Sequence, residues 1–225
     1  MSSLKQSLFE VIARMGKALG NRHRLELLEL LAQGPRSVDS LARATGASLA
    51  TTSHHLQQLR QAGLVVGEKR GKQVFYRVSG EDVVALFVEL REVAQAHLAE
   101  VQTLLRDHLE RRDQLEAVGA EDLLRRLRSG EVVVLDVRPE EEYAAGHVPG
   151  AVNVPLDRLE EALASLPPGR EVVAYCRGPH CLLAFEAVER LRAAGRAARR
   201  LEGGMPEWRL AGLPVVEEAG QQEDE

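Results

Sequence analysis

Apolar side chains in the first third of the chain recur at helical spacing. Between Leu4 and Leu19 they stand three and four positions apart, and the segment after Asn21 repeats this pattern until Gly34 and Pro35. Such spacing places side chains along one face of an α-helix. We therefore expect two amphipathic helices, with Asn21 as the N-cap of the second.

Two shorter helices and a hairpin are predicted next. Ser37 and Ser48 are of a type that caps helix N-termini, and Gly46 and Gly63 stand where the two helices should end. Apolar runs on either side of a glycine-containing turn then predict a β-hairpin over residues 64–78.

A long segment without Gly or Pro follows, from Glu81 to about Glu116. Apolar and histidine side chains recur in it at steps of three and four, which predicts one long helix with a coiled-coil-like stripe. We expect this stripe to pack against a second copy of the chain in a homodimer. It consists of Leu86, Leu90, Val93, His97, Val101, Leu104 and His108.

The second half of the chain changes to a pattern of alternating strands and helices. Apolar runs at 132–137, 151–156 and 171–176 read as strands, and helical segments lie between them at 159–166 and 182–194. Strands that alternate with helices indicate an α/β domain with a mostly parallel sheet.

Charge separates the two halves. Residues 1–79 carry 12 Lys and Arg against 5 Asp and Glu, a net charge of +7, while the whole chain has a net charge of −5. This asymmetry suggests that only the first part meets nucleic acid. No apolar stretch approaches the ~18 residues of a membrane span, and the N-terminus lacks the apolar block of a signal peptide. We therefore expect a cytoplasmic protein with no membrane partner.

The stretch ASLATTSHHLQQLRQAGLVVGEKRGKQVFYRVS resembles the ArsR-type winged helix–turn–helix repressors, and the likeness extends over about residues 5–110. It implies a double-stranded DNA operator as partner. Leu56 and Leu59 should face inward and short polar side chains outward, toward base edges in the major groove. Thr52 departs from the apolar residue usual in the family. The expected DNA contacts are Ser48, Thr51, Ser53, His54 and Gln57, with Lys69, Arg70 and Lys72 of the hairpin on phosphates or in a minor groove.

Many members of this family sense metals, but the metal ligands are missing here. The family's thiolate site falls at Ser37 and Asp39, and the first half of its other site falls near Val84 and Leu86. These residues cannot supply the three or four ligands that Zn²⁺ needs. We therefore expect no metal and no cofactor.

The only two cysteines, Cys176 and Cys181, stand in a short loop between an apolar run and a helix. The segments VVVLDVRPEEEYAAGHVPGAVNVPL, YCRGPHCLLAFEAVERLRAAG and LEGGMPEWRLAGLPV resemble the opening motif, active-site loop and closing motif of rhodanese domains. The resemblance spans about residues 118–217 and implies that Cys176 accepts sulfane sulfur. Backbone amides in such a loop, together with the following helix N-terminus, favour a thiolate or a persulfide anion.

One feature departs from thiosulfate-using rhodaneses. Cys181 and Leu182 replace the basic and hydroxyl residues that often follow the cysteine, so a dianionic donor would be held less well. Cys181 is either a resolving thiol or a small buried residue at the start of a helix. The expected reactive site comprises Cys176, Arg177, Gly178, Pro179, His180 and Cys181, supported by Asp136 and Arg138.

The sequence thus predicts an α+β multidomain protein in four parts. These are a winged helix–turn–helix domain at 1–80, mostly α with a β-hairpin wing, a dimerisation helix at 81–117, a rhodanese-like α/β domain at 118–217 and a disordered acidic tail at 218–225. One hypothesis is a DNA-binding regulator that senses reactive sulfur or redox state through Cys176. The alternative is a sulfurtransferase enzyme tethered to a DNA-binding head. Either would take a small sulfur donor, namely a polysulfide, a persulfide or thiosulfate.

Overall fold

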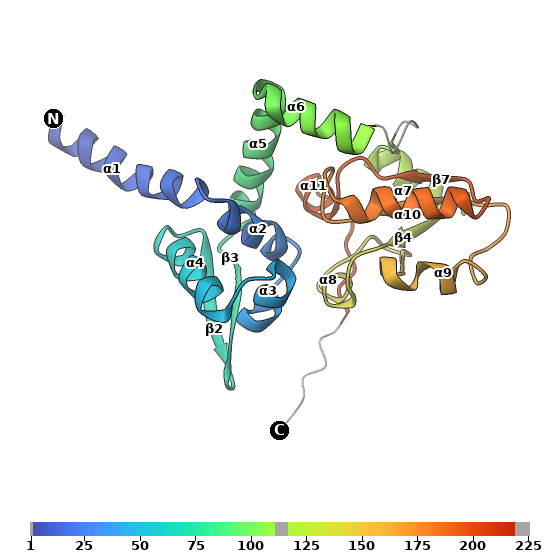
Figure 1. Ribbon diagram of the computed structural model, residues 1–225, viewed down its shortest axis with the longest axis horizontal. Coiled ribbons are helices and arrows are strands. Elements are labelled where there is room, and N and C mark those ends of the chain that lie inside the picture. The colour runs from blue at the N-terminus through green and yellow to red at the C-terminus, as the bar shows by residue number, and fades with distance from the viewer. Residues whose placement is uncertain (1, 111–116, 219–225) are drawn as a thin grey trace. The chain divides into compact units, whose positions relative to one another are not determined.

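The computed structural model describes residues 2–110 and 117–218, which divide into two compact units, Met1–Leu90 and Arg91–Glu225 (Figure 1). Residues 111–116, at the end of the predicted long helix, lie outside the described residues, as does the predicted acidic tail beyond residue 218. None of the described helices combines the length and apolar character that crossing a membrane requires.

Unit 1 is built from helices and a three-stranded antiparallel sheet of order β1-β3-β2. Its elements are α1 (Ser2–Leu19), α2 (Arg22–Leu31), β1 (Arg36–Ser37), α3 (Val38–Thr45), α4 (Leu49–Gln61), β2 (Val65–Arg70), β3 (Gln73–Val78) and the first part of α5 (Glu81–His97). The three predicted caps are confirmed, because the side chains of Asn21, Ser37 and Ser48 accept hydrogen bonds from the first turns of α2, α3 and α4. Gly46 ends α3 with a φ of 66°, a left-handed conformation that glycine adopts easily.

The core of unit 1 lies between α2, α3, α4 and the sheet. Leu41 of α3 and Leu56 and Leu59 of α4 are fully buried in it, and Tyr76 of β3 packs against the same cluster. The predicted inward face of α4 is therefore confirmed. Burial of this face fixes the helix and leaves its opposite face directed to solvent.

Unit 2 contains a four-stranded parallel sheet of order β5-β4-β6-β7. Its elements after α5 are α6 (Ala99–Leu105), η1 (Arg106–Glu110), α7 (Ala120–Arg128), β4 (Val132–Asp136), α8 (Glu140–Ala144), β5 (Val152–Asn153), η2 (Leu156–Arg158), α9 (Leu159–Ala162), β6 (Glu171–Tyr175), α10 (Leu182–Ala193), β7 (Ala198–Arg200) and α11 (Met205–Leu210). The parallel sheet expected from the alternating pattern is confirmed. Strand β7 was not predicted, because its three residues ARR carry no apolar run.

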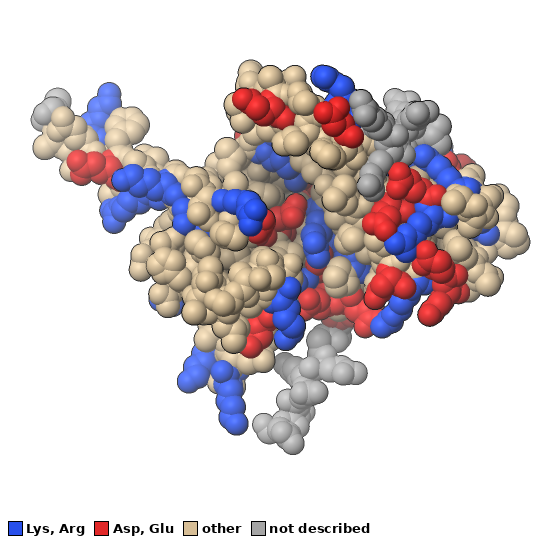
Figure 2. Space-filling view, in the orientation of Figure 1, with Lys and Arg blue, Asp and Glu red and all other residues tan. Residues whose placement is uncertain are grey.

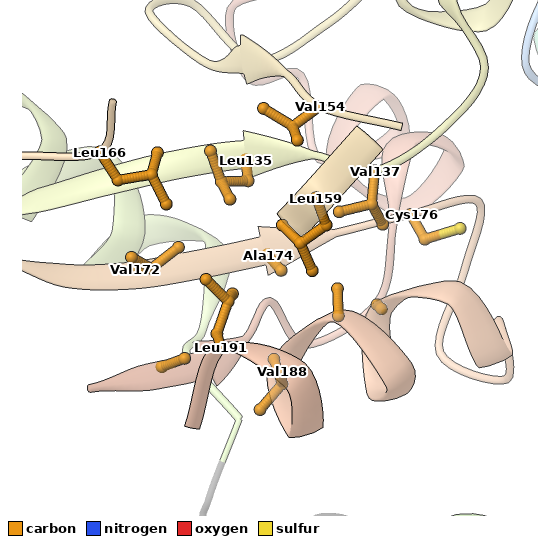
Figure 3. Close-up of a cluster of buried hydrophobic side chains, with 13 residues drawn as sticks. Leu135, Val137, Val154, Leu159, Leu166, Val172, Ala174, Cys176, Val188 and Leu191 are labelled. Atoms are coloured by element: carbon orange, nitrogen blue, oxygen red, sulfur yellow. The ribbon is translucent and has the colours of Figure 1, made fainter. Parts of the chain in front are cut away.

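Both faces of this sheet are covered by apolar side chains. Alternate residues of β6 point to opposite sides, so that Val172 and Ala174 pack with α9 and α10, whereas Val173 and Tyr175 pack with α7 and α11. Figure 3 shows the first of these clusters, with Cys176 at its end beside Val137 and its sulfur directed away from the labelled aliphatic side chains. The reactive loop therefore begins where the core of the domain ends.

The prediction of one uninterrupted helix from Glu81 is wrong. Helix α5 ends at His97, and Leu98 takes an extended backbone with φ −103° and ψ 109° before α6 begins. The Gln102 side-chain amide donates to the carbonyls of Gln95 and Ala96, each at 3.2 Å. Two carbonyls at the end of α5 thereby gain a partner, which allows a helix to stop without Gly or Pro.

Candidate functional site

The cysteine loop, defined here as residues 176–181, connects β6 to α10. Cys176 follows the last residue of β6 and is only 1 % exposed, whereas Cys181 is half-buried and precedes the first residue of α10. The two residues are joined by a disulfide, with their Cα atoms 6.2 Å apart. The structure thus brings together the thiols of the predicted reactive cysteine and its candidate resolving cysteine.

The closing motif packs directly against this loop. The backbone N–H of Met205 donates to the carbonyl oxygen of Cys176 at 3.2 Å. A Cβ added at Gly204 would lie 2.4–2.6 Å from backbone atoms of Gly178, Arg177 and Cys176, so a side chain has no room there. Glycine at position 204 is therefore required for the close approach of the two backbones.

The charge of Arg177 is paired with a carboxylate outside the cysteine loop. Its guanidinium forms a bidentate pair with Glu142 of α8, in which Nε donates to Oε2 at 3.0 Å and Nη2 donates to Oε1 at 2.7 Å. The Glu142 side chain is fully buried. This carboxylate neutralises much of the positive charge of Arg177, and it anchors the loop to α8.

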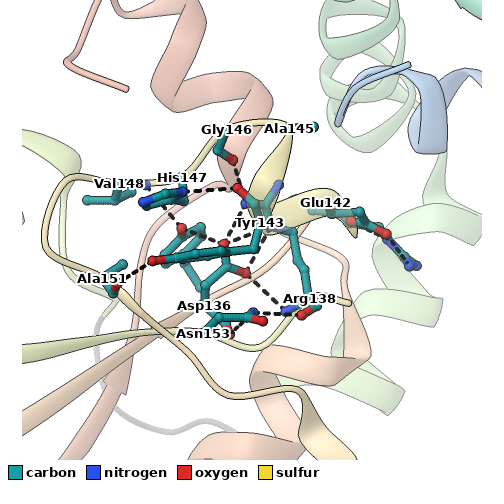
Figure 4. Close-up of polar contacts among 12 residues, drawn as sticks. Asp136, Arg138, Glu142, Tyr143, Ala145, Gly146, His147, Val148, Ala151 and Asn153 are labelled. Carbon is teal, nitrogen blue, oxygen red and sulfur yellow. Dashed lines mark hydrogen bonds and ion pairs between the residues drawn. The ribbon is translucent and has the colours of Figure 1, made fainter. Parts of the chain in front are cut away.

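Asp136 and Arg138 form a buried network at the end of β4 (Figure 4). Both side chains are 0 % exposed, and Arg138 Nε donates to Asp136 Oδ1 at 2.9 Å while Nη2 donates to the Gly146 carbonyl at 2.8 Å. The Tyr175 hydroxyl donates to Asp136 Oδ2 at 2.6 Å. Burial raises the pKa of Tyr175, and the neighbouring Asp136 charge adds to this effect. The network therefore holds Tyr175, which immediately precedes Cys176, in place. Because Asp136 and Arg138 are paired with each other, they do not act as reagents at the cysteine loop.

His180 of the cysteine loop lies close to two positively charged side chains. Burial lowers the pKa of His180, and the charges of Arg91 and Arg200 lower it further, while Glu207 acts in the opposite direction. The imidazole is therefore neutral near pH 7. The sequence did not predict that Arg91 and Arg200 lie near the cysteine loop, because they are distant from it in the chain and belong to no motif.

Most of the predicted DNA contacts lie on the solvent-facing side of α4 and at the tip of the hairpin. Seven of the eight are exposed and only Ser53 is half-buried, and the side chain of Ser48 also caps α4. Figure 2 shows Lys and Arg side chains gathered at the hairpin tip. Arg70 there also pairs with Glu68 at 3.0 Å. The exposed residues are Ser48, Thr51, His54, Gln57, Lys69, Arg70 and Lys72.

Arg24 and Gln58, which carry no signal in the sequence, form hydrogen bonds that position α4. Arg24 of α2 donates to the carbonyls of Ala18 and Lys17 and to the side-chain oxygen of Gln58. Gln58 Nε2 in turn lies 2.9 Å from His54 Nε2. This chain of hydrogen bonds links α1 and α2 to a predicted base-contacting side chain on α4. Only the tertiary structure reveals it, since Arg24 and Gln58 stand 34 positions apart.

Thr52 is buried under α4, where its hydroxyl finds no hydrogen-bond partner among the described residues. A buried polar group without a partner is destabilising. We expect Thr52→Val to raise the free energy of unfolding of unit 1 by about 1 kcal/mol, because valine keeps the shape and removes the hydroxyl. Chemical denaturation measures this change. Thr45→Val is the matched control, and it should destabilise because the Thr45 hydroxyl donates to the Leu41 carbonyl at 2.9 Å. Equal effects from both variants would contradict the prediction.

We expect His55 to make the stability of unit 1 depend on pH. Its ring stacks on that of His23 with centroids 5.4 Å apart. Burial lowers the pKa of His55 below its ordinary 6.5, and the charges of Arg24, His23 and His54 lower it further, whereas a hydrogen bond to Gln58 opposes them. The unfolded chain therefore takes up the proton first, so stability is complete above about pH 6.5 and falls as the pH drops through the folded value.

Thermal unfolding between about pH 7.5 and about pH 5 tests this expectation. The decrease in the melting temperature should be smaller in His55→Gln than in the wild type. His97→Gln, which changes an exposed histidine of α5, serves as control and should follow the wild type. A His55→Gln curve parallel to that of the wild type would refute the assignment.

No group of three or more His, Cys, Asp or Glu side chains suited to a metal ion occurs among the described residues. The chain matches two family models. One describes a bacterial regulatory protein of the arsR family and covers residues 21–66, and the other describes a rhodanese-like domain and covers residues 119–211.

Three proteins are similar to the whole chain or to one of its halves. HTH-type transcriptional regulator Rv0324 of Mycobacterium tuberculosis is 49 % identical over 218 residues, which cover 97 % of this chain and 96 % of the relative. A sulfurtransferase of Allochromatium vinosum is 31 % identical over 105 residues, or 46 % of this chain and 96 % of the relative. A homodimeric winged helix–turn–helix DNA-binding domain from Mycobacterium bovis, a solved fragment, is 47 % identical, with a TM-score of 0.41, and covers 43 % of this chain and 89 % of that fragment.

Proposed function

Because this chain belongs to the ArsR family of bacterial regulatory proteins and carries a C-terminal rhodanese-like domain, we propose that it is a transcriptional regulator that senses reactive sulfur through its two cysteines. One observation carries the proposal: the only two cysteines of the chain are joined in the loop at the end of β6. A regulator needs a chemical change that a signal molecule can cause, and closure of this pair is such a change.

DNA binding belongs to unit 1 in this proposal. The side chains of α4 read base edges in the major groove, and the basic hairpin tip contacts phosphates. A homodimer would place two such helices on one operator, as palindromic sites require. The partner copy would cover apolar side chains of α1 and α5 that are exposed in a single chain. These are Leu4, Leu8, Phe9, Val11 and Ile12 of α1, and Leu86, Leu90 and Val93 of α5.

The sulfur chemistry of the proposal proceeds in two steps. The Cys176 thiolate attacks the terminal sulfur of a donor persulfide, the sulfur–sulfur bond of the donor breaks, and the donor leaves as a thiol with the persulfide proton. Cys176 then carries the persulfide anion. The Cys181 thiol next attacks the Cys176 sulfur, so the disulfide forms and hydrosulfide leaves with the Cys181 proton. The two cysteines lose two electrons, and the sulfane sulfur gains them.

Intact-mass analysis and DNA-binding titrations on the same samples test the proposal. After treatment of the reduced protein with polysulfide, the wild type should show first a mass gain of one sulfur and then the loss of two hydrogens, together with a change in operator affinity. Cys176→Ser should show neither change. Arg128→Gln, an exposed site on α7, is the control and should respond as the wild type does. Identical DNA-binding responses in the wild type and Cys176→Ser would discard the proposal.

A sulfurtransferase enzyme is the second candidate, and the likeness to the Allochromatium vinosum sulfurtransferase favours it. The two functions differ in turnover. An enzyme transfers many sulfur atoms per active site from thiosulfate or polysulfide to an acceptor thiol, whereas a sensor reacts once with its signal. Cys181 favours the sensor, because it removes the persulfide within the same loop before an external acceptor arrives. Multiple turnovers measured with the wild type would support the enzyme.

A further inference from the structure

Helix α5 crosses the boundary between the two units. Its residues as far as Leu90 belong to unit 1, and Arg91–His97 belong to unit 2. Within unit 2, Arg91 and Gln95 stand four positions apart and so share one face of the helix. Both have partners at the cysteine loop or at the closing motif that packs on it.

Arg91 contacts both the closing motif and the cysteine loop. Its guanidinium forms an ion pair with Glu207 of α11, and the side chains of Arg91 and Glu207 are only 14 % and 22 % exposed. Its Nη1 atom also lies 2.9 Å from the position that a Cβ on Gly178 would take, so the guanidinium rests against the middle of the loop. Gly178 stands between the two cysteines.

Glu207 ties this ion pair to the backbone that supports the loop. Its Oε2 atom accepts a hydrogen bond from the N–H of Gly204 at 2.8 Å. Gly204 is the residue that packs against the backbone of Cys176, Arg177 and Gly178. One carboxylate therefore joins the closing motif, through Gly204, to helix α5, through Arg91.

Gln95 makes the second contact one helical turn further along. Its Oε1 atom lies 3.1 Å from Nε2 of His180, which directly precedes Cys181. The two contacts of α5 thus fall on Gly178 and His180, both within the segment that connects the cysteines. We call Arg91, Gln95 and Glu207 the loop contact.

We propose that the loop contact transmits the state of the Cys176–Cys181 pair to helix α5, with Arg91, Gln95 and Glu207 acting as positioning residues. The inference deepens the proposed function and rests on it. Cys176 is 1 % exposed in the disulfide form, so the residues between the cysteines must move before a donor reaches its sulfur. Those residues are the ones that α5 touches.

Coupling of this kind requires that α5 makes different contacts in the two states of the loop. The disulfide holds the loop against Arg91 and Gln95, and the reduced or persulfidated loop releases them. Because α5 continues without interruption into unit 1, its residues before Arg91 carry the change toward the DNA-binding domain.

Hydrogen exchange of the full-length protein tests the contact without DNA. Amides of residues 91–97 should exchange at least about fivefold more slowly in the disulfide form than in the reduced form. The difference should disappear in Glu207→Gln, which removes the charge but keeps an oxygen for the Gly204 N–H, and in Gln95→Ala with Arg91→Gln. Arg91→Lys should restore part of it. Arg128→Gln is the control for loss of a positive charge and should match the wild type.

Operator affinity of both redox forms separates this inference from the proposed function. If exchange in α5 depends on the redox form but operator affinity does not, the loop contact stands and the sensing proposal fails. If affinity changes equally in the wild type and in Gln95→Ala with Arg91→Gln, the sensing proposal stands and the loop contact is overturned. Equal exchange of residues 91–97 in both forms of the wild type also overturns it. Gln95 is exposed, so Gln95→Ala alone remains informative should a variant at Arg91 fail to fold.

Discussion

Arg138→Ala is expected to lower the free energy of unfolding of the rhodanese-like domain by about 3–5 kcal/mol. The substitution leaves the Asp136 carboxylate at 0 % exposure without the guanidinium that pairs with it. It also removes the donor to the Gly146 carbonyl. A buried charge without a partner costs far more than the intact pair contributes, so the loss exceeds that of an ordinary hydrogen bond.

Chemical denaturation of the full-length protein, followed by the fluorescence of Trp208, measures this loss because the single tryptophan is buried in unit 2. Tyr175→Phe provides a graded comparison. It removes one hydrogen bond to Asp136 and should cost about 1–3 kcal/mol. Arg128→Ala, on the exposed end of α7, is the control and should stay within about 0.5 kcal/mol of the wild type. If Arg138→Ala were no worse than Arg128→Ala, the network would not support β4 and β6 as described.

Cys181→Ser is expected to stop the reaction of the cysteine loop at the persulfide. Cys176 can still accept a sulfur atom, but no second thiol of the chain can displace it, since the chain holds only two cysteines. After exposure to polysulfide, the intact mass should rise by one sulfur and stay there, whereas the wild type should go on to lose two hydrogens. The persulfide should be released only when an external thiol is added.

The same variant identifies which chemical form acts on DNA. If the disulfide is the signal, polysulfide should no longer change the operator affinity of Cys181→Ser, and if the persulfide is the signal, the change should persist. Cys176→Ser is the comparison and should acquire no sulfur. Disappearance of the added sulfur from Cys181→Ser at the wild-type rate, without external thiol, would show that Cys181 is not the resolving residue.

Local patterns in the sequence were sufficient for the elements nearest the site. The helix caps at Ser37 and Ser48, the inward face of α4 at Leu56 and Leu59, and the strand that ends just before Cys176 all follow from residue types and spacing within one element. Such features depend on contacts between neighbours in the chain, and the chain order contains them directly. The short strand β7 and the break at Leu98 did not follow, because neither carries an apolar run, a glycine or a proline.

The sequence alone determined that a helix–turn–helix domain and a cysteine loop occur in one chain, because both are carried by short motifs. Only the tertiary structure decided what surrounds the cysteines. Arg177 pairs with Glu142 across 35 positions, and Arg91 pairs with Glu207 across 116. No periodicity encodes such pairs, since they exist only after the parallel sheet has brought the ends of β4 and β6 together and Arg91 has met the closing motif. The reactive residues of the site can thus be identified from local sequence. The ion pairs that set its charge and link it to other elements arise only from tertiary packing.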